Sequence, residues 1–280
     1  MADLNKTSSS KFISENPIIR KLKKADSYDS ERVCSYKGIA AKLVFFLLVT
    51  AVGIGLCAFM KATSAFGGDL IFEGTLYEDS ENVVRIYSNE LFIIIGVGIV
   101  SIVAPLLATF LVKTIPVTGS LFCASIGFLL AWAAMTFADI YLAPVLLALV
   151  ITLMLVFTMG FLFGMGIIKV TQKLKSFLMI AMITVCLGSL LVFIASLIPF
   201  TSGLVAQLAA NPVLSIGGSV LMVVIGTLFL LVDFDTIQQC VDNRLDKQYE
   251  WYASFGLAFS VIWLYLKVLD LIIKIMGKNR

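Results

Sequence analysis

The chain has 280 residues, of which 60% are hydrophobic and only 14% are charged. An ordinary soluble domain is about half apolar and about a quarter charged, so this composition excludes a water-soluble enzyme. The net charge of +3 is too small and too scattered to indicate a nucleic-acid partner. Histidine is absent, which removes Ser-His-Asp and Cys-His catalysis and imidazole metal sites. We therefore expect no enzyme activity, no catalytic residue and no cofactor.

The first 38 residues form a polar, basic tail. They hold eight lysines and arginines and five acidic residues, with no apolar run long enough for the core of a signal peptide. We therefore expect residues 1–38 to be retained as a cytoplasmic tail, and residues 39–280 to form a separate transmembrane domain.

From Ile39 onward the sequence consists of long apolar runs. A helix of about 20 residues crosses a hydrocarbon core of about 30 Å at a rise of about 1.5 Å per residue. The runs therefore predict an all-α integral membrane protein with seven spans. Their approximate ranges are 39–60, 91–112, 119–138, 143–168, 177–198, 213–236 and 252–275. The fifth and sixth spans are divided at Pro199 and at Asn211-Pro212, where proline and small polar residues favour a turn.

The basic residues in the connecting loops predict the orientation of the spans. With the amino terminus inside, the inner side holds fourteen lysines and arginines and the outer side five. Because basic residues stay on the cytoplasmic side, we expect a cytoplasmic amino terminus. The carboxyl terminus is less clear, since Lys274, Lys278 and Arg280 lie at its end. A retained tail and the lack of an organelle signal indicate a bacterial cytoplasmic membrane.

Five cysteines are present, and no two have C-x-x-C spacing. Most lie inside apolar runs, where cysteine behaves as a small hydrophobic residue. We therefore expect neither a disulfide framework nor a zinc site.

A few ionisable residues interrupt the apolar runs, and each is a candidate for function because a charge inside a membrane is costly. The strongest candidates are Asp233 and Asp235 in the sixth span and Lys267 and Asp270 in the seventh. Residues i and i+2 of a helix point about 200° apart, so only one aspartate of the first pair is expected to face the bundle interior. Lys267 and Asp270 share a helix face, so a local ion pair without further function stays open. Lys113, at the end of the second span, is interpreted as an orientation charge or as a partner for a carboxylate.

The carboxyl-terminal third resembles the Bax inhibitor/YccA family, the transmembrane Bax inhibitor motif proteins, in their longer bacterial form. The resemblance lies in three segments: Leu231-Val-Asp-Phe-Asp-Thr-Ile-Gln, Tyr249-Glu-Trp-Tyr-Ala-Ser-Phe-Gly and Trp263-Leu-Tyr-Leu-Lys-Val-Leu-Asp. The tail is similar as well, through Asn16-Pro17 and Ser35-Tyr-Lys-Gly-Ile.

The resemblance implies a compact bundle in which the other six helices surround the last one, and a pH-sensitive calcium leak. In bacterial relatives the gate resembles two aspartates that share a proton, together with an arginine near the inner end of the second span. Asp235 matches the first aspartate. The second position is Lys267, and Lys113 matches the arginine position.

Lysine at the second gate position changes the expected chemistry. Two close carboxylates share a proton, whereas a carboxylate beside a lysine stays ionised. We therefore predict a latch between Asp235 and Lys267 across two helices, with Asp270 as a competing partner of the lysine. Asp235 is also a possible transient calcium contact, but a single aspartate cannot form a tight calcium site.

Two other functions stay open at this point. The protein could regulate a membrane-bound protease through its tail without any transport, or it could be a proton-coupled secondary transporter. An intramembrane protease is a poorer match, because no aspartyl-protease context surrounds the aspartates. In every case the partner that the composition itself indicates is the lipid bilayer.

Overall fold

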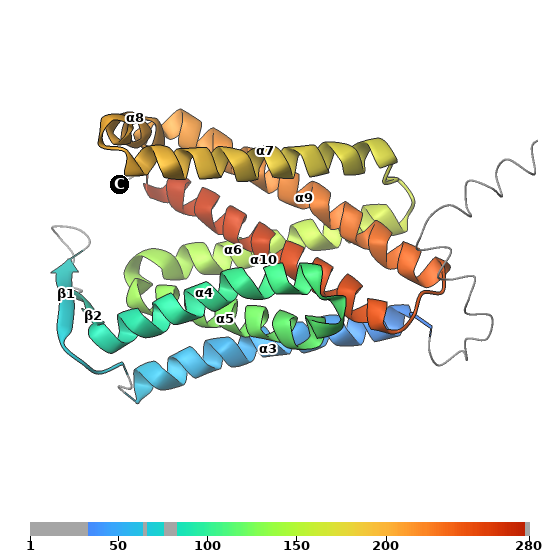
Figure 1. Ribbon diagram of the computed structural model, residues 1–280, viewed down its shortest axis with the longest axis horizontal. Coiled ribbons are helices and arrows are strands. Elements are labelled where there is room, and N and C mark those ends of the chain that lie inside the picture. The colour runs from blue at the N-terminus through green and yellow to red at the C-terminus, as the bar shows by residue number, and fades with distance from the viewer. Residues whose placement is uncertain (1–32, 64–65, 76–82, 278–280) are drawn as a thin grey trace, which may run out of the picture.

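The computed structural model describes residues 33–63, 66–75 and 83–277, and it is an all-α membrane bundle (Figure 1). Seven of its helices are long and apolar enough to cross a membrane, which confirms the predicted fold class and number of spans. The elements, in chain order, are α3 (Tyr36–Ala62), β1 (Leu70–Thr75), β2 (Val83–Tyr87), α4 (Ser88–Phe110), η2 (Val112–Thr114), α5 (Ile115–Thr136), α6 (Ala138–Gly164), α7 (Gln172–Leu197), α8 (Pro199–Ala210), α9 (Pro212–Asp242) and α10 (Gln248–Gly277).

The helices begin where polar side chains satisfy free backbone N–H groups. The Ser35 hydroxyl accepts a hydrogen bond from Gly38 N at the start of α3. Thr171 caps α7 by accepting from Leu174 N. Asn211 caps α9 in the same way, directly before Pro212 at the first position of that helix. Such caps stabilise a helix end because the first turn has no internal hydrogen-bond partner.

A β hairpin and a short helix were not predicted from the sequence. The segment after α3 contains an antiparallel hairpin, in which Glu73 pairs with Arg85 in the strand register. The turn expected between the fifth and sixth spans contains the short helix α8, which begins at Pro199. The predicted break at Pro199 and at Asn211-Pro212 is correct, because α7, α8 and α9 meet there.

The helices α3 and α5 are in contact through their backbones. A Cβ atom at Gly53 would lie 2.2 Å from the Ala124 carbonyl oxygen, and one at Gly127 would lie 2.2 Å from the Thr50 carbonyl oxygen. Only glycine permits this approach. Phe46 of α3 and Phe122 of α5 continue the contact into a core that also contains α4 and α10.

The last helix, α10, runs through the middle of the bundle and packs mainly against α9, α6 and α3 (Figure 1). The helix α7 is different, because it lies at the outside and packs against α8 and α9. In Figure 1 the β hairpin, α8 and the end of α10 lie at one end, which we call the hairpin end. The starts of α3, α7 and α10 lie at the other, which we call the amino-terminal end.

Candidate functional site

Polar and small residues on α9 and α10 face each other along most of the length of both helices. On α9 the residues are Ser219, Gly226, Asp233 and Cys240, spaced seven apart. On α10 they are Gly256, Ser260, Trp263, Lys267, Asp270 and Lys274. At 3.6 residues per turn, the α10 set falls within an arc of about 80°, so it forms one face of the helix. We call this surface between the two helices the seam.

Contacts between the two sets show that they meet. The hydroxyl of Ser219 donates a hydrogen bond of 2.6 Å to Asp270 Oδ2. A Cβ atom at Gly226 would lie 2.9 Å from Trp263 Cζ3, so this glycine makes room for the indole ring. Asp233 interacts with the Ser260 hydroxyl on α10. The seam therefore has a polar part in each half of the bundle, with an aromatic contact between them.

Asp233 is the partly buried carboxylate in the amino-terminal part of the seam. Its Oδ2 atom has no hydrogen-bond partner among the described residues, although it is shielded from the surface. Its Oδ1 atom lies 3.5 Å from the position that a Cβ of residue 256 would occupy, and that residue is glycine. An unpartnered polar atom inside a membrane protein is costly and therefore marks a candidate functional site.

The predicted latch between Asp235 and Lys267 is not formed. Asp235 Oδ2 lies 2.5 Å from Lys175 Nζ of α7, and Gln239 Nε2 donates to the same oxygen at 2.6 Å. Asp235 lies two residues from Asp233 and points to the other side of α9, as the helix geometry predicts. That side faces α7, which is why a lysine of α7, and not one of α10, neutralises it.

Lys267 instead lies over the ring of Trp263, with Nζ 5.6 Å from the ring centroid. Within the described ranges, no carboxylate lies within 4 Å of this ammonium group. Asp270 pairs with Lys274, at 2.8 Å and one helical turn away. The local pair of Lys267 with Asp270 therefore does not form, although the two groups are close enough to interact electrostatically.

Lys113 lies in η2 and is exposed. It makes no ion pair in the part of the chain that the structure describes, so the predicted partnership with a carboxylate is not found. The interpretation as an orientation charge is compatible with this position, because η2 joins two spans at the amino-terminal end.

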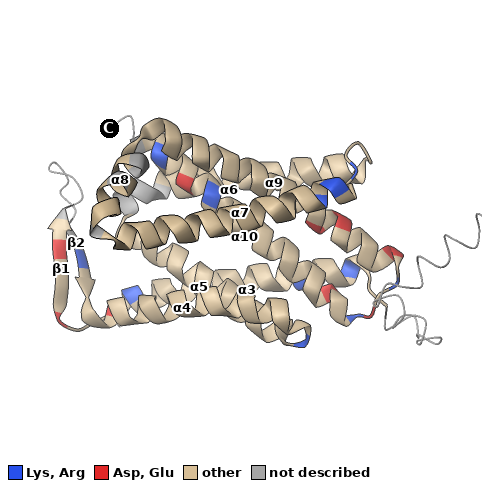
Figure 2. Cartoon of the chain, turned by 45° about the horizontal axis from the view of Figure 1, so that its top comes forward, with Lys and Arg blue, Asp and Glu red and all other residues tan. Residues whose placement is uncertain are grey.

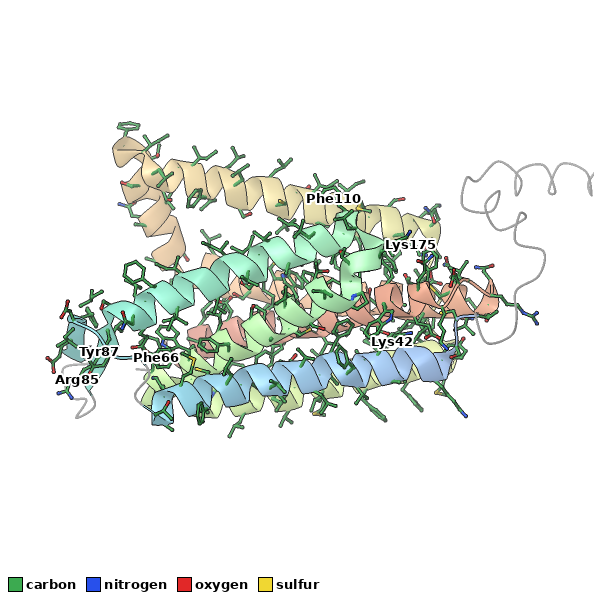
Figure 3. The ribbon with its side chains drawn as sticks, turned by 60° about the horizontal axis from the view of Figure 1, so that its bottom comes forward. Lys42, Phe66, Arg85, Tyr87, Phe110 and Lys175 are labelled. Atoms are coloured by element: carbon green, nitrogen blue, oxygen red, sulfur yellow. The ribbon has the colours of Figure 1, made fainter. Side chains whose placement is uncertain are left out.

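A cleft of about 640 Å³ opens beside Asp235. Its lining includes Lys169 and Gly166 from the α6–α7 connection, Tyr36 from the start of α3, and Phe234 and Gln238 from α9. Figure 3 shows Lys42 of α3 and Lys175 of α7 at the amino-terminal end, opposite the hairpin of Arg85 and Tyr87. The cleft therefore lies at the amino-terminal end, where many of the charged residues gather (Figure 2).

A buried ion pair that the sequence analysis missed joins the starts of α3 and α10. Glu250 is 1% exposed and pairs with Lys42, which also lies over the Trp251 ring at 5.1 Å. Ser35 donates to Glu250 Oε1 from its backbone N at 2.9 Å and from its hydroxyl at 3.1 Å. Both charges could be recognised in the sequence, because Lys42 lies one turn inside the first span and Glu250 lies at the start of the last one. Nothing in the spacing of either residue indicated that they meet.

Cys34 directly precedes Ser35 in the chain, and it packs against Cys240 of α9. Burial raises the pKa of the Cys34 thiol to about 12, and the nearby Cys240 and Glu250 act in the same direction. All five cysteines are free thiols, as expected, and four of them are buried. The fifth, Cys186, is exposed on α7.

A second buried carboxylate lies toward the hairpin end. Glu90 is 2% exposed and accepts a hydrogen bond of 2.6 Å from the Trp132 indole nitrogen. It also caps α4 by accepting from Tyr87 N. Outside the spans, the Glu73 carboxylate raises the pKa of Arg85, but this pair is exposed.

No group of three cysteine or acidic side chains in the described residues is arranged to hold a metal ion. The carboxylates of α9 and α10 near the seam, Asp233, Asp235 and Asp270, could therefore contact a metal ion only singly. They lie on the seam or next to it.

The whole of this arrangement falls within a single match to a known family. The family model described as Bax inhibitor 1 like matches residues 16–277. The chain belongs to the Bax inhibitor 1-like family. The match includes the part of the tail from residue 16 onward, together with all seven membrane-length helices. No individual curated protein matches the sequence.

Proposed function

We propose that this integral membrane protein is a slow, passive leak for calcium, and that ions move along the seam between α9 and α10. Membership of the Bax inhibitor 1-like family supports this function through the calcium leak that the family resemblance implies. The observation that carries the proposal is Asp233, a carboxylate inside the membrane with one oxygen unpartnered.

The distribution of polar groups along the seam supports a path of this kind. In the amino-terminal half, Asp233 and Ser260 interact on the seam, and a cleft opens beside Asp235 on the other side of α9. In the hairpin half, Ser219, Asp270 and Lys274 form a hydrogen-bonded group. Ionisable side chains within membrane spans often mark ion pathways, because a charge inside a membrane is costly.

The chemistry favours transit over storage. Calcium takes six to eight oxygen ligands, and a tight site needs several carboxylates. In the described residues the seam provides single carboxylates separated along the helix axis, so an ion would be bound weakly at each of them. Weak binding permits release, which a leak requires.

The test is calcium flux into liposomes that contain the purified protein, measured across about pH 5–8. This range also tests the pH response that the resemblance implies. Asp233→Asn removes the charge at nearly constant volume, and we expect it to change the flux by about tenfold, the ratio that corresponds to 1.4 kcal/mol. Asp69→Asn is the control, because Asp69 lies in the connection outside the spans and is exposed. A folded wild-type protein without flux above empty liposomes would contradict the proposal.

A further inference from the structure

Trp263 divides the seam into two polar parts. It is 15 residues from the first residue of α10 and 14 from the last, so it lies at the middle of that helix. Its ring rests against Gly226 of α9, where a Cβ atom would come within 2.9 Å of Cζ3 and 3.2 Å of Cε3. The contact leaves no space between the two helix backbones at this level.

The two parts differ in exposure. On the hairpin side of Trp263, the side chains of Asp270 and Lys274 are 43% and 34% exposed. On the amino-terminal side, Ser260 is buried and the Asp233 Oδ2 atom is inaccessible. The charged pair on the hairpin side of Trp263 is therefore partly exposed, and we call this the open side, whereas the Asp233 Oδ2 atom on the other side is inaccessible. An apolar constriction of this type blocks ions because it excludes water.

Lys267 adds a charge directly on the open side of this constriction. Its ammonium group is held over the Trp263 ring. Among the described residues, no carboxylate lies within 4 Å to neutralise it. Asp270 is already bound by Ser219 and Lys274. The open part of the seam therefore has two lysines and one aspartate, which gives a local charge of +1 and opposes the approach of a cation.

We propose that Trp263 is the barrier to ion passage along the seam, and that Lys267 sets its charge selectivity. This inference rests on the proposed calcium leak and assigns two residues of the same path. The ring limits the rate, and the ammonium group lowers the permeability to cations relative to anions.

The first experiment compares leak rates in liposomes. Trp263→Ala is expected to raise calcium flux by about tenfold, because it removes the side chain that fills the space at Gly226. Tyr265→Ala is the matched control, since it truncates an aromatic residue of the same helix on the side away from the seam. If both variants raise flux equally, the barrier does not lie at Trp263. If Trp263→Ala does not fold, Gly226→Ala replaces it, because the added Cβ forces the ring to move.

The second experiment tests selectivity. Lys267→Gln keeps a polar side chain that is one atom shorter and removes its charge. It should raise the ratio of calcium to chloride permeability by about tenfold at the low effective dielectric of a protein interior. Lys173→Gln is the control, because Lys173 is exposed on α7 and lies away from the seam. An unchanged ratio in Lys267→Gln would overturn the assignment of selectivity.

A third measurement does not depend on flux and separates the barrier from the proposed function. Ser260→Cys places a thiol directly behind Trp263, and labelling by a membrane-impermeant methanethiosulfonate added on the hairpin side is followed at that peptide by mass spectrometry. We expect slow labelling with Trp263 present and at least about tenfold faster labelling in combination with Trp263→Ala. Equal rates would refute the barrier even if the wild-type protein conducts calcium. Faster labelling without calcium flux would retain the barrier and refute the leak.

Discussion

Glu250 is expected to be among the most important single residues for stability, although it lies outside the proposed path. It is 1% exposed and its partner Lys42 is 13% exposed, so the pair is largely removed from water. Removing one partner of such a pair costs about 3–5 kcal/mol, because the other charge stays buried without compensation. Glu250→Gln keeps an oxygen that can accept from Ser35 and removes only the charge, so its effect isolates the ion pair.

The expected change is measurable by thermal unfolding in detergent. For a chain of this size, 1 kcal/mol corresponds to a shift in Tm of about 2–4 °C, so the loss of the ion pair predicts a decrease of about 6–20 °C. The unfolding is followed by circular dichroism at constant detergent concentration. Gly38→Ala should have a similar effect with both charges retained, because its Cβ would lie 2.2 Å from Glu250 Oε1 and displace the carboxylate.

The control is the exposed pair of Arg85 with Glu73, whose side chains are 56% and 45% exposed. Surface ion pairs contribute about 0–1 kcal/mol, so Glu73→Gln should lower Tm by no more than about 4 °C. If Glu250→Gln and Glu73→Gln lower Tm by the same amount, burial does not make the Lys42–Glu250 pair more important for stability than an exposed pair.

Three further predictions concern packing, the α7 contact and alkaline pH. Gly53→Ala should destabilise the protein by about 3 kcal/mol or more, because the added Cβ would clash at the α3–α5 contact. Gly55→Ala is the control in the same unfolding assay. Its Cβ would meet no atom within 4 Å, so it should be neutral or slightly stabilising. Lys175→Gln should increase protease cleavage in the α6–α7 connection, because it breaks the ion pair with Asp235. Lys173→Gln should not increase cleavage. Equal cleavage of the two variants would count against the ion pair as the link between α7 and α9. The raised pKa of Cys34 means that the folded state resists forming the thiolate, so stability associated with this group is complete below about pH 9 and is lost toward pH 12. Cys34→Ser should therefore reduce the fall in Tm over this range, and an unchanged fall would contradict the assigned cause.

The seven helices were predictable because hydropathy and length alone specify a membrane span. The ends of the spans were less accurate, since α9 includes Asp233 and Asp235, as predicted, but continues beyond the predicted end at residue 236 to Asp242. Hydropathy could not show this continuation, because the added turns are largely polar yet remain helical. The hairpin was missed for a different reason: its strands are short, and they lie in the connection between the first two predicted spans.

The site was predicted in part. The four candidate charges of the last two spans do lie on the seam or beside it, but their partners were not predictable from spacing. Asp235 is bound by Lys175, a residue that the sequence analysis used only as an orientation charge. The reason is geometric, because the side of α9 that Asp235 occupies is covered by α7 and not by α10. Sequence spacing fixes which face a residue shares, whereas the identity of the neighbouring helix depends on the packing of the whole bundle.

The two halves of the bundle differ in how they are held together, and this difference bears on function. The half built on α3 and α5 is held by backbone contact at Gly53 and Gly127, where a shift of either helix would produce a clash. The half built on α9 and α10 shares an apolar cluster that includes Leu230 and Leu264. Along the seam it is joined by polar contacts and by one aromatic ring on a glycine. Polar contacts can be exchanged for water or for an ion, whereas close backbone packing cannot. A change of permeability is therefore expected to involve movement at the seam while α3 and α5 stay in place, which is consistent with a leak that does not require the bundle to unfold.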